Sequence, residues 1–132
     1  MRVLRALSVF LACLLAATSA HSEQSAMEVA VRILHPVQVA RFASESCDGI
    51  AINQNGLRIH YLRAEETFRE IGESSDKWLR IRYSESDFSA LNEELSKKHG
   101  LTNESSESEV CHAIQREHHD QTLIGKLLLV EE

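Results

Sequence analysis

The sequence contains none of the short motifs that mark many enzymes. It has no Gly-x-Ser-x-Gly segment, no His-Glu-x-x-His segment and no glycine-rich phosphate loop, so it gives no support to the hydrolases, metalloproteases and nucleotide-binding enzymes that carry them. Acidic residues are numerous, but no spacing singles out two of them as an acid and base pair. A catalytic site assembled from distant residues leaves no local signature, so a small secreted hydrolase stays the least favoured of three functional interpretations.

Positive charge is also scarce. The chain has 14 Lys and Arg residues against 20 Asp and Glu residues, a formal net charge of −6. If the first 20 residues are removed, Arg2 and Arg5 leave with them, and 12 basic residues then face 20 acidic ones, a formal charge of −8. This excess argues against nucleic acid as a partner, because the phosphate backbone attracts basic proteins.

The chain has one long hydrophobic run, from Ala6 to Ala17. It is shorter than the roughly 20 residues that a membrane-spanning helix needs. It follows two arginines and ends in Thr18-Ser19-Ala20, which predicts a signal peptide over 1–20 with cleavage after Ala20. We therefore expect a secreted or periplasmic protein without stable membrane insertion, in which residues 21–132 form a single domain and 21–26 a flexible leader.

Cysteine is sparse, and its positions are informative. Cys13 lies in the expected signal peptide, which leaves Cys47 and Cys111 in the exported chain. Two cysteines in an oxidising compartment predict a disulfide. Closing a loop of about 65 residues restricts the unfolded chain by about 4 kcal/mol. The pair forms no Cys-x-x-Cys motif, which argues against a redox role.

Alternating hydrophobic residues predict several strands. Val29, Val31 and Ile33 alternate with their neighbours, and Pro36 separates them from a second short run, so strands are expected over 29–34 and 37–42. The segment 50–62 predicts a hairpin with strands over 50–52 and 57–62, because its Asn55-Gly56 pair favours a tight turn. Further strands are expected over 78–83 and 123–130.

Three helices are expected between these strands. Ala64, Phe68 and Ile71 recur with helical spacing before Gly72. A second helix, over 87–99, ends in basic residues and is followed by Gly100, a suitable left-handed cap. A third begins at a Ser106-x-x-Glu109 capping box and carries Val110, Cys111 and Ile114 inward. The element order predicts an α+β fold: one two-layer domain, mainly antiparallel sheet with two to three helices on one face, closed by one disulfide.

In such a sheet, basic and aromatic side chains would share one face. With the hydrophobic residues of 57–62 and 78–83 turned inward, the opposite positions would form a basic and aromatic patch, with Arg32 facing the same way. Arginine suits carboxylate, phosphate or sulfate groups, and tryptophan offers a flat anchor. The candidate binding residues are Arg58, His60, Trp78, Arg80 and Arg82.

All 7 histidines lie beyond residue 20, which raises the alternative of a metal-binding protein. His118, His119 and Asp120 are the weak candidates, since only an irregular turn would bring them onto one ion. Cleavage after Ala20 would also make His21 the first residue, and its amine and imidazole together suit copper. No cofactor is expected.

The favoured interpretation is an exported small binding module that acts through the basic and aromatic sheet face. Inhibitors, immunity-type proteins and accessory factors are the classes that fit. The expected partner is another protein or an anionic ligand. A periplasmic metal-binding protein is the second interpretation, and the small hydrolase is the third.

Overall fold

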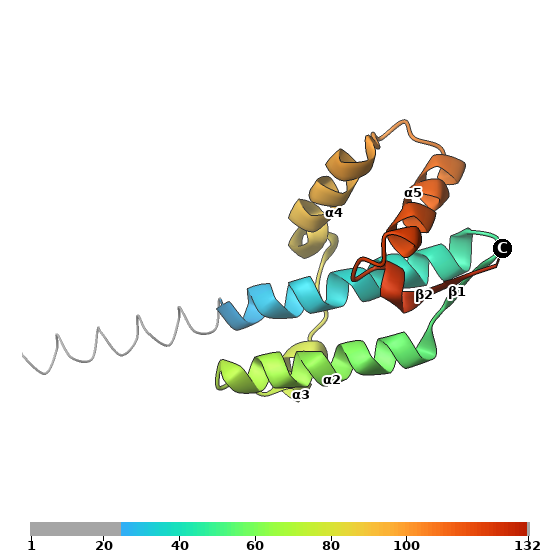
Figure 1. The fold of residues 1–132 in the computed structure, drawn as a ribbon. Coiled ribbons are helices and arrows are strands. Elements are labelled where there is room, and N and C mark those ends of the chain that lie inside the picture. Colours follow the sequence, from blue (N-terminus) through green and yellow to red (C-terminus); the bar gives the residue numbers. More distant parts are fainter. Residues whose placement is uncertain (1–24, 132) are drawn as a thin grey trace, which may run out of the picture.

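The computed structural model describes residues 25–131, which are mainly helical. Residues 25–46 form a long first helix that runs through the middle of the molecule (Figure 1). Helix α2 lies on one side of it, while α4 and α5 lie on the other. The remaining elements follow in chain order: β1 (Ile50–Ile52), α2 (Gln54–Glu70), α3 (Ser75–Leu79), α4 (Glu85–His99), α5 (Glu107–His119), the short 3₁₀ helix η1 (Gly125–Leu127) and β2 (Leu128–Val130).

The predicted α+β fold dominated by an antiparallel sheet is wrong. Within residues 25–131 the sheet consists of two strands of three residues each, β1 and β2, which pair antiparallel with Ile50 opposite Val130. The segments expected to be strands over 29–34, 37–42 and 57–62 are helical instead. The segment 78–83 holds the end of α3 and the irregular chain that follows it.

The first helix shows why alternation misled the prediction. Val31, His35, Val39, Ala43 and Cys47 are all buried, and they recur every four residues, which is the spacing of one helical face. β-Branched residues at alternate positions are typical of a strand. The buried alanines of this segment have helical spacing instead, since Ala26 and Ala30 are four residues apart and Ala40 and Ala43 three. Residues 25 and 26, which the sequence assigns to the leader, belong to this helix, and Ala26 is fully buried.

Pro36 lies inside the first helix and leaves a gap in its hydrogen bonding. Proline has no N–H to offer the carbonyl of Arg32, and its ring crowds the preceding turn. One residue further on, the carbonyl of Ile33 accepts a hydrogen bond from His60 Nε2 of α2 over 2.7 Å. The proline therefore weakens the helix at the point where a side chain of α2 reaches its backbone.

The predicted hairpin is also wrong, although its first strand exists. Ile50–Ile52 is β1, but its partner is β2 and not 57–62. Asn53 is the N-cap of α2, and its Oδ1 accepts a hydrogen bond from the Gly56 N–H over 3.0 Å. An asparagine followed three residues later by an accessible N–H favours a helix start as readily as a turn. Only the long-range pairing of β1 with β2 decides between the two.

The helix ends further along the chain are confirmed. Helix α4 ends at His99, and Gly100 takes the left-handed conformation with φ +66°. Helix α5 begins with the expected capping box at Ser106 and Glu109. The helix expected over 64–71 is the second half of α2, and Gly72 after it has φ +74°.

The first helix carries two hydrophobic clusters along its length. Near its beginning, Ala26 and Ala30 pack with Phe68 of α2 and Trp78 of α3. The larger cluster lies along its second half and joins it to α5, η1 and the two strands; its buried members are Val37, Val39, Ala40, Ala43, Cys47, Ile50, Ile114, Ile124, Leu127 and Leu128. Helix α2 and helix α5 thus both pack on η1 and the first helix.

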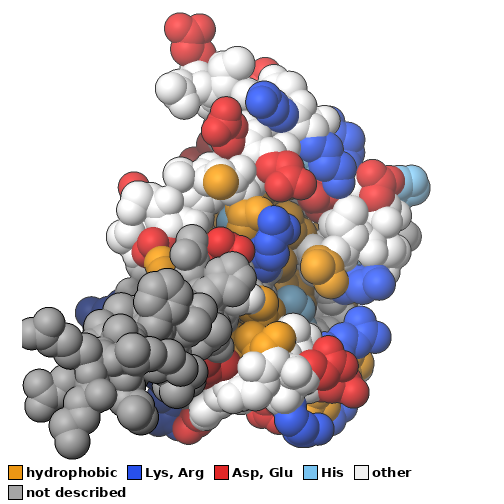
Figure 2. Space-filling view, turned by 90° about the vertical axis from the view of Figure 1, so that its left-hand side faces the viewer, with side chains coloured by type: hydrophobic (Ala, Val, Ile, Leu, Met, Phe, Trp, Pro, Cys, Tyr) orange, Lys and Arg blue, Asp and Glu red, His pale blue; other side chains and the backbone are white. Residues whose placement is uncertain are grey.

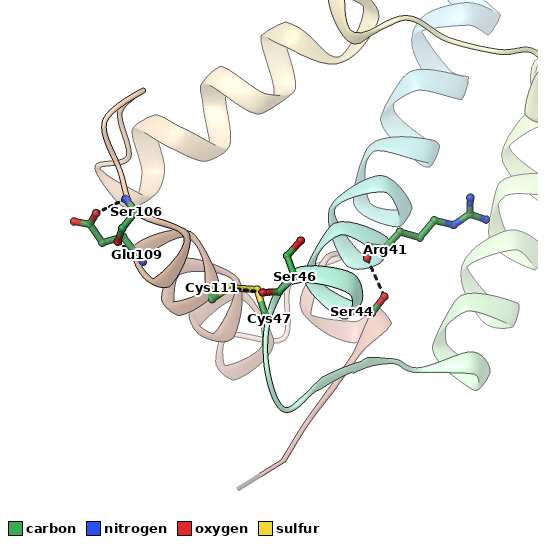
Figure 3. Close-up of a disulfide and its surroundings, with 7 residues drawn as sticks. All are labelled: Arg41, Ser44, Ser46, Cys47, Ser106, Glu109 and Cys111. Carbon is green, nitrogen blue, oxygen red and sulfur yellow. Dashed lines mark hydrogen bonds between the residues drawn. A yellow bond between two sulfur atoms is a disulfide. The ribbon is translucent and has the colours of Figure 1, made fainter.

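The predicted disulfide is confirmed. Cys47, just beyond the first helix, is bonded to Cys111 of α5, with Cα atoms 5.7 Å apart (Figure 3). Cys47 is itself a buried member of the larger cluster, so the bond fixes α5 to the core of the domain. The signal peptide expected over 1–20 and His21 lie outside the described residues. No helix within residues 25–131 is long and apolar enough to cross a membrane.

The capping box of α5 leads to a prediction about pH. The Glu109 carboxylate accepts a hydrogen bond from the Ser106 N–H over 2.6 Å, and this bond lowers the pKa of Glu109. A carboxyl whose pKa is lower in the folded state adds stability above its unfolded pKa and loses it as pH falls through the folded pKa. We expect Glu109→Gln to lower the melting temperature at neutral pH. In strong acid the variant and the native chain should have the same melting temperature. Thermal melts at several pH values measure this; a gap between the two proteins that persists in strong acid would contradict it.

Candidate functional site

The residues of the predicted patch do not share a face of a sheet. Arg58 and His60 lie on α2, and Trp78 lies on α3. Arg80 and Arg82 follow α3, in the connection to α4. The face on which the patch depended is absent because the strands that would have formed it are helical or irregular. The structure therefore separates these residues into two regions, one on α2 and one around α3.

The region around α3 has mainly structural contacts. Trp78 is 7% exposed, and its Nε1 donates a hydrogen bond to Glu73 Oε2 over 3.0 Å. Arg80 and Asp76 form an ion pair of 3.3 Å between side chains that are both more than three-quarters exposed. Exposed pairs of this kind contribute little stability. A buried tryptophan cannot serve as the flat anchor that the sequence suggested.

The histidines at the end of α5 are not gathered with Asp120 into one group of ligands. His118 and His119 are the last two residues of that helix, and Asp120 is its C-cap. The His118 ring is turned toward η1, since its Nδ1 lies 3.2 Å from the carbonyl oxygen of Gly125. Among residues 25–131 there is no group of three or more His, Cys, Asp and Glu residues that could hold a metal ion.

His118 and His60 nevertheless line the same hollow, between the beginning of α2, the end of α5 and the η1–β2 segment. We call it the basic hollow; its volume is about 350 Å³. It is thus the place where one residue of the predicted patch meets one residue of the predicted metal cluster. Its lining residues are Asn53, Asn55, Gly56, Ile59, His60, Arg63, His118, Gln121, Leu123, Gly125, Lys126, Leu127, Leu128 and Leu129.

Two glycines allow the walls of the basic hollow to meet. A Cβ atom on Gly56 would collide with the carbonyl oxygen of Lys126, and one on Gly125 would collide with the backbone of Glu117. The Asn53 N–H donates a hydrogen bond to the Leu127 carbonyl over 2.8 Å, which holds the N-terminus of α2 on η1. The contact of α2 with η1 therefore joins backbone segments about 70 residues apart, and that of η1 with α5 joins neighbouring segments.

The electrostatic character of the basic hollow differs from that of the chain. Its lining includes Arg63, Lys126, His60 and His118 but no carboxylate, although the whole chain has 20 acidic residues and 14 Lys and Arg residues. By contrast, the face of the molecule in Figure 2 carries acidic and basic side chains side by side. A hollow with basic groups alone, in an acidic protein, attracts a negatively charged ligand.

Hydrophobic side chains surround these basic groups. Ile59 is 39% exposed, Leu123 is 56% exposed and Leu129 is 53% exposed, which places all three among the exposed large hydrophobic residues of the described chain. Single exposed hydrophobic residues are common on protein surfaces, whereas several around one hollow indicate a binding site. The arrangement suits a ligand that is both negatively charged and partly hydrophobic.

Both histidines of the basic hollow are oriented by backbone carbonyls. His60 Nε2 lies 2.7 Å from the Ile33 carbonyl, and His118 Nδ1 lies 3.2 Å from the Gly125 carbonyl. A carbonyl only accepts hydrogen bonds, so these ring nitrogens carry the hydrogen. Each ring is therefore held in one orientation before any ligand arrives.

No protein-family model, curated protein or solved structure matches this chain. Any function must therefore be argued from the geometry described above.

The sequence patterns did not single out five residues of the basic hollow: Ile59, Arg63, Leu123, Lys126 and Leu129. One signal was available, because Ile59 and Arg63 are four residues apart and share a face once 54–70 is taken as a helix. The predicted hairpin concealed that signal. Nothing in the local sequence places Lys126 and Leu129 beside α2, since only the packing of η1 on α2 does so.

A buried acidic group, also missed, bears on the hydrolase interpretation. Glu117 is 3% exposed, and its Oε2 lies 2.5 Å from Lys98 Nζ and 3.5 Å from His99 Nε2. A general base needs a free oxygen within reach of substrate. Oε2 is instead paired with Lys98 across the interface of α4 with α5, so this oxygen is not free and the cluster joins the two helices.

Proposed function

We propose that this chain is an exported, disulfide-closed helical binding module that holds an acidic, partly hydrophobic segment of another protein in the basic hollow. Inhibitors, immunity-type proteins and accessory factors are the classes of binding module that this proposal covers. The observation that carries the proposal is the lining of the hollow, which combines four basic side chains with no carboxylate in an otherwise acidic chain.

The chemistry of the hollow defines what its partner must present. Arg63 can hold a carboxylate through two parallel hydrogen bonds, and Lys126 of η1 adds a second positive charge. A volume of about 350 Å³ accommodates one or two side chains and not a folded element. We therefore expect a partner segment in which carboxylates flank a hydrophobic residue that contacts Leu123 and Leu129.

Two features support export. The disulfide between Cys47 and Cys111 is typical of proteins from oxidising compartments. The first 20 residues have the composition of a signal peptide. Together they favour a secreted or periplasmic location, where the partner protein would also be found.

Synthetic peptides test the proposed specificity directly. We expect a short peptide of alternating glutamate and leucine to bind with saturation, and the same peptide with lysine in place of glutamate not to bind. Reversing both charges with Arg63→Glu and Lys126→Glu should weaken the glutamate peptide at least tenfold, because two attractive contacts become repulsive. Fluorescence anisotropy of a labelled peptide at low and high salt measures both effects.

A matched control comes from the other basic region of the chain. Arg80→Glu with Arg82→Glu makes the same change in net charge near α3, and both side chains are exposed. This variant should bind the glutamate peptide with close to native affinity. If both variants weakened binding equally, the effect would come from net charge and not from the basic hollow. Binding of the lysine peptide would contradict the proposed chemistry.

A further inference from the structure

A second and larger hollow lies on another part of the molecule, between the first helix, α4 and α5. We call it the three-helix groove; its volume is about 940 Å³. Val39 of the first helix, Leu95 of α4 and Ile114 of α5 contribute to its floor. Its size falls within the range of pockets that hold small molecules.

The three-helix groove differs from the basic hollow in its polar groups. Those around its floor are mostly hydroxyls and amides, among them Ser89, Ser96 and Thr102. Its charged side chains are Glu85, Glu93 and Lys97, all on α4, with the almost fully buried ring of His99 behind them. Two carboxylates and one lysine leave a negative surplus that disfavours an anion, whereas hydroxyls and amides bond readily to neutral polar groups.

The groove also leaves a large hydrophobic side chain in water. Phe42 of the first helix lines it and is 43% exposed, although this ring lies one turn from the buried Val39. Covering such a ring is favourable by about 25 cal/mol for each Å² removed from water. Among the groove's lining residues it is the group with most to gain from a ligand.

We propose that the three-helix groove binds a neutral, single-chain amphiphile, with the chain along Val39, Leu95 and Ile114 and an uncharged hydroxylated head at the serine and threonine hydroxyls. An apolar floor beside several hydroxyls and amides fits that class of molecule. An anionic lipid head would instead meet two carboxylates and one lysine, a surplus of its own sign. This inference is independent of the basic hollow, which shares no lining residue with the groove.

A neutral fluorescent probe tests this site. N-phenyl-1-naphthylamine brightens when it enters an apolar environment, and we expect it to bind the native chain with saturation. Monodecanoylglycerol, kept below its critical micelle concentration, should displace it. Ser89→Trp places a large side chain at the rim of the groove and should weaken probe binding at least tenfold.

Ala90→Trp is the matched control, because Ala90 is the next residue of α4, is exposed and does not line the groove. This variant should bind the probe as the native chain does. Equal binding by the two tryptophan variants, or no displacement by monodecanoylglycerol, would overturn the proposal. A probe signal that appears only as the chain dimerises, measured by light scattering, would assign the groove to a second copy and would also overturn it.

Discussion

Replacing Gly125 with alanine is expected to destabilise the domain by about 3 kcal/mol or more, a large value even for an overpacked core position. A Cβ at this position would lie 2.5 Å from the carbonyl carbon of Glu117 and 2.7 Å from the Cα of His118. These are backbone atoms of α5, which cannot rotate away as a side chain would. Either η1 or the end of α5 must move, and both line the basic hollow.

Chemical denaturation measures the loss, and Gly100→Ala provides the control. Gly100 has φ +66° with open space around it, so alanine there meets only the ordinary strain of a left-handed conformation, about 1 kcal/mol. Gly125 has no positive φ, so the destabilisation by alanine at this position comes from steric contact alone. If Gly125→Ala were no more costly than Gly100→Ala, the close packing of η1 on α5 would be wrong. A folded Gly125→Ala protein should also lose affinity for the glutamate peptide.

The sequence predicted those features that depend on a few neighbouring residues. Gly100 after a basic turn gives a left-handed helix end, and Ser106 with Glu109 gives a helix start, wherever the helices go afterwards. The pairing of Cys47 with Cys111 needed only the count of cysteines left after the expected export. In each case the residues involved favour one local structure, so the tertiary structure did not change the outcome.

Other predictions failed because the local pattern was compatible with two different structures. Val29, Val31 and Ile33 fit a half-buried strand, but the first helix buries Ala26 and Ala30 against Phe68, and small residues allow that close approach. Asn53 fits either a turn or an N-cap. The choice was made by the pairing of β1 with β2, which are separated along the chain by α2, α3, α4 and α5.

The basic hollow could not be predicted for the same reason. Arg63 and Lys126 line one site only because Gly56 lets the N-terminus of α2 rest on the Lys126 carbonyl. A single glycine within a helix carries no local signal of such a contact. The net charge made basic residues the candidates for binding, but it did not locate Arg63 and Lys126.

Loss of the disulfide is expected to be the most damaging covalent change. The bond joins residues 64 positions apart, and releasing a loop of that length increases the entropy of the unfolded chain by an amount equivalent to about 4 kcal/mol at room temperature. A domain of this size has a total stability of about 5–15 kcal/mol, so much of it depends on this bond. We expect Cys47→Ala with Cys111→Ala to lower the denaturant midpoint strongly.

Cys47 is also buried in the larger hydrophobic cluster, so the double variant loses packing as well as the bond. Unfolding the native chain with and without a reductant separates the two effects, because reduction breaks the bond and keeps both side chains. The reductant should lower the midpoint of the native chain and leave that of the double variant unchanged. A native chain equally stable with and without reductant would show that the bond contributes no stability. The fixed position of α5, and with it that of His118 in the basic hollow, would then have to come from packing alone.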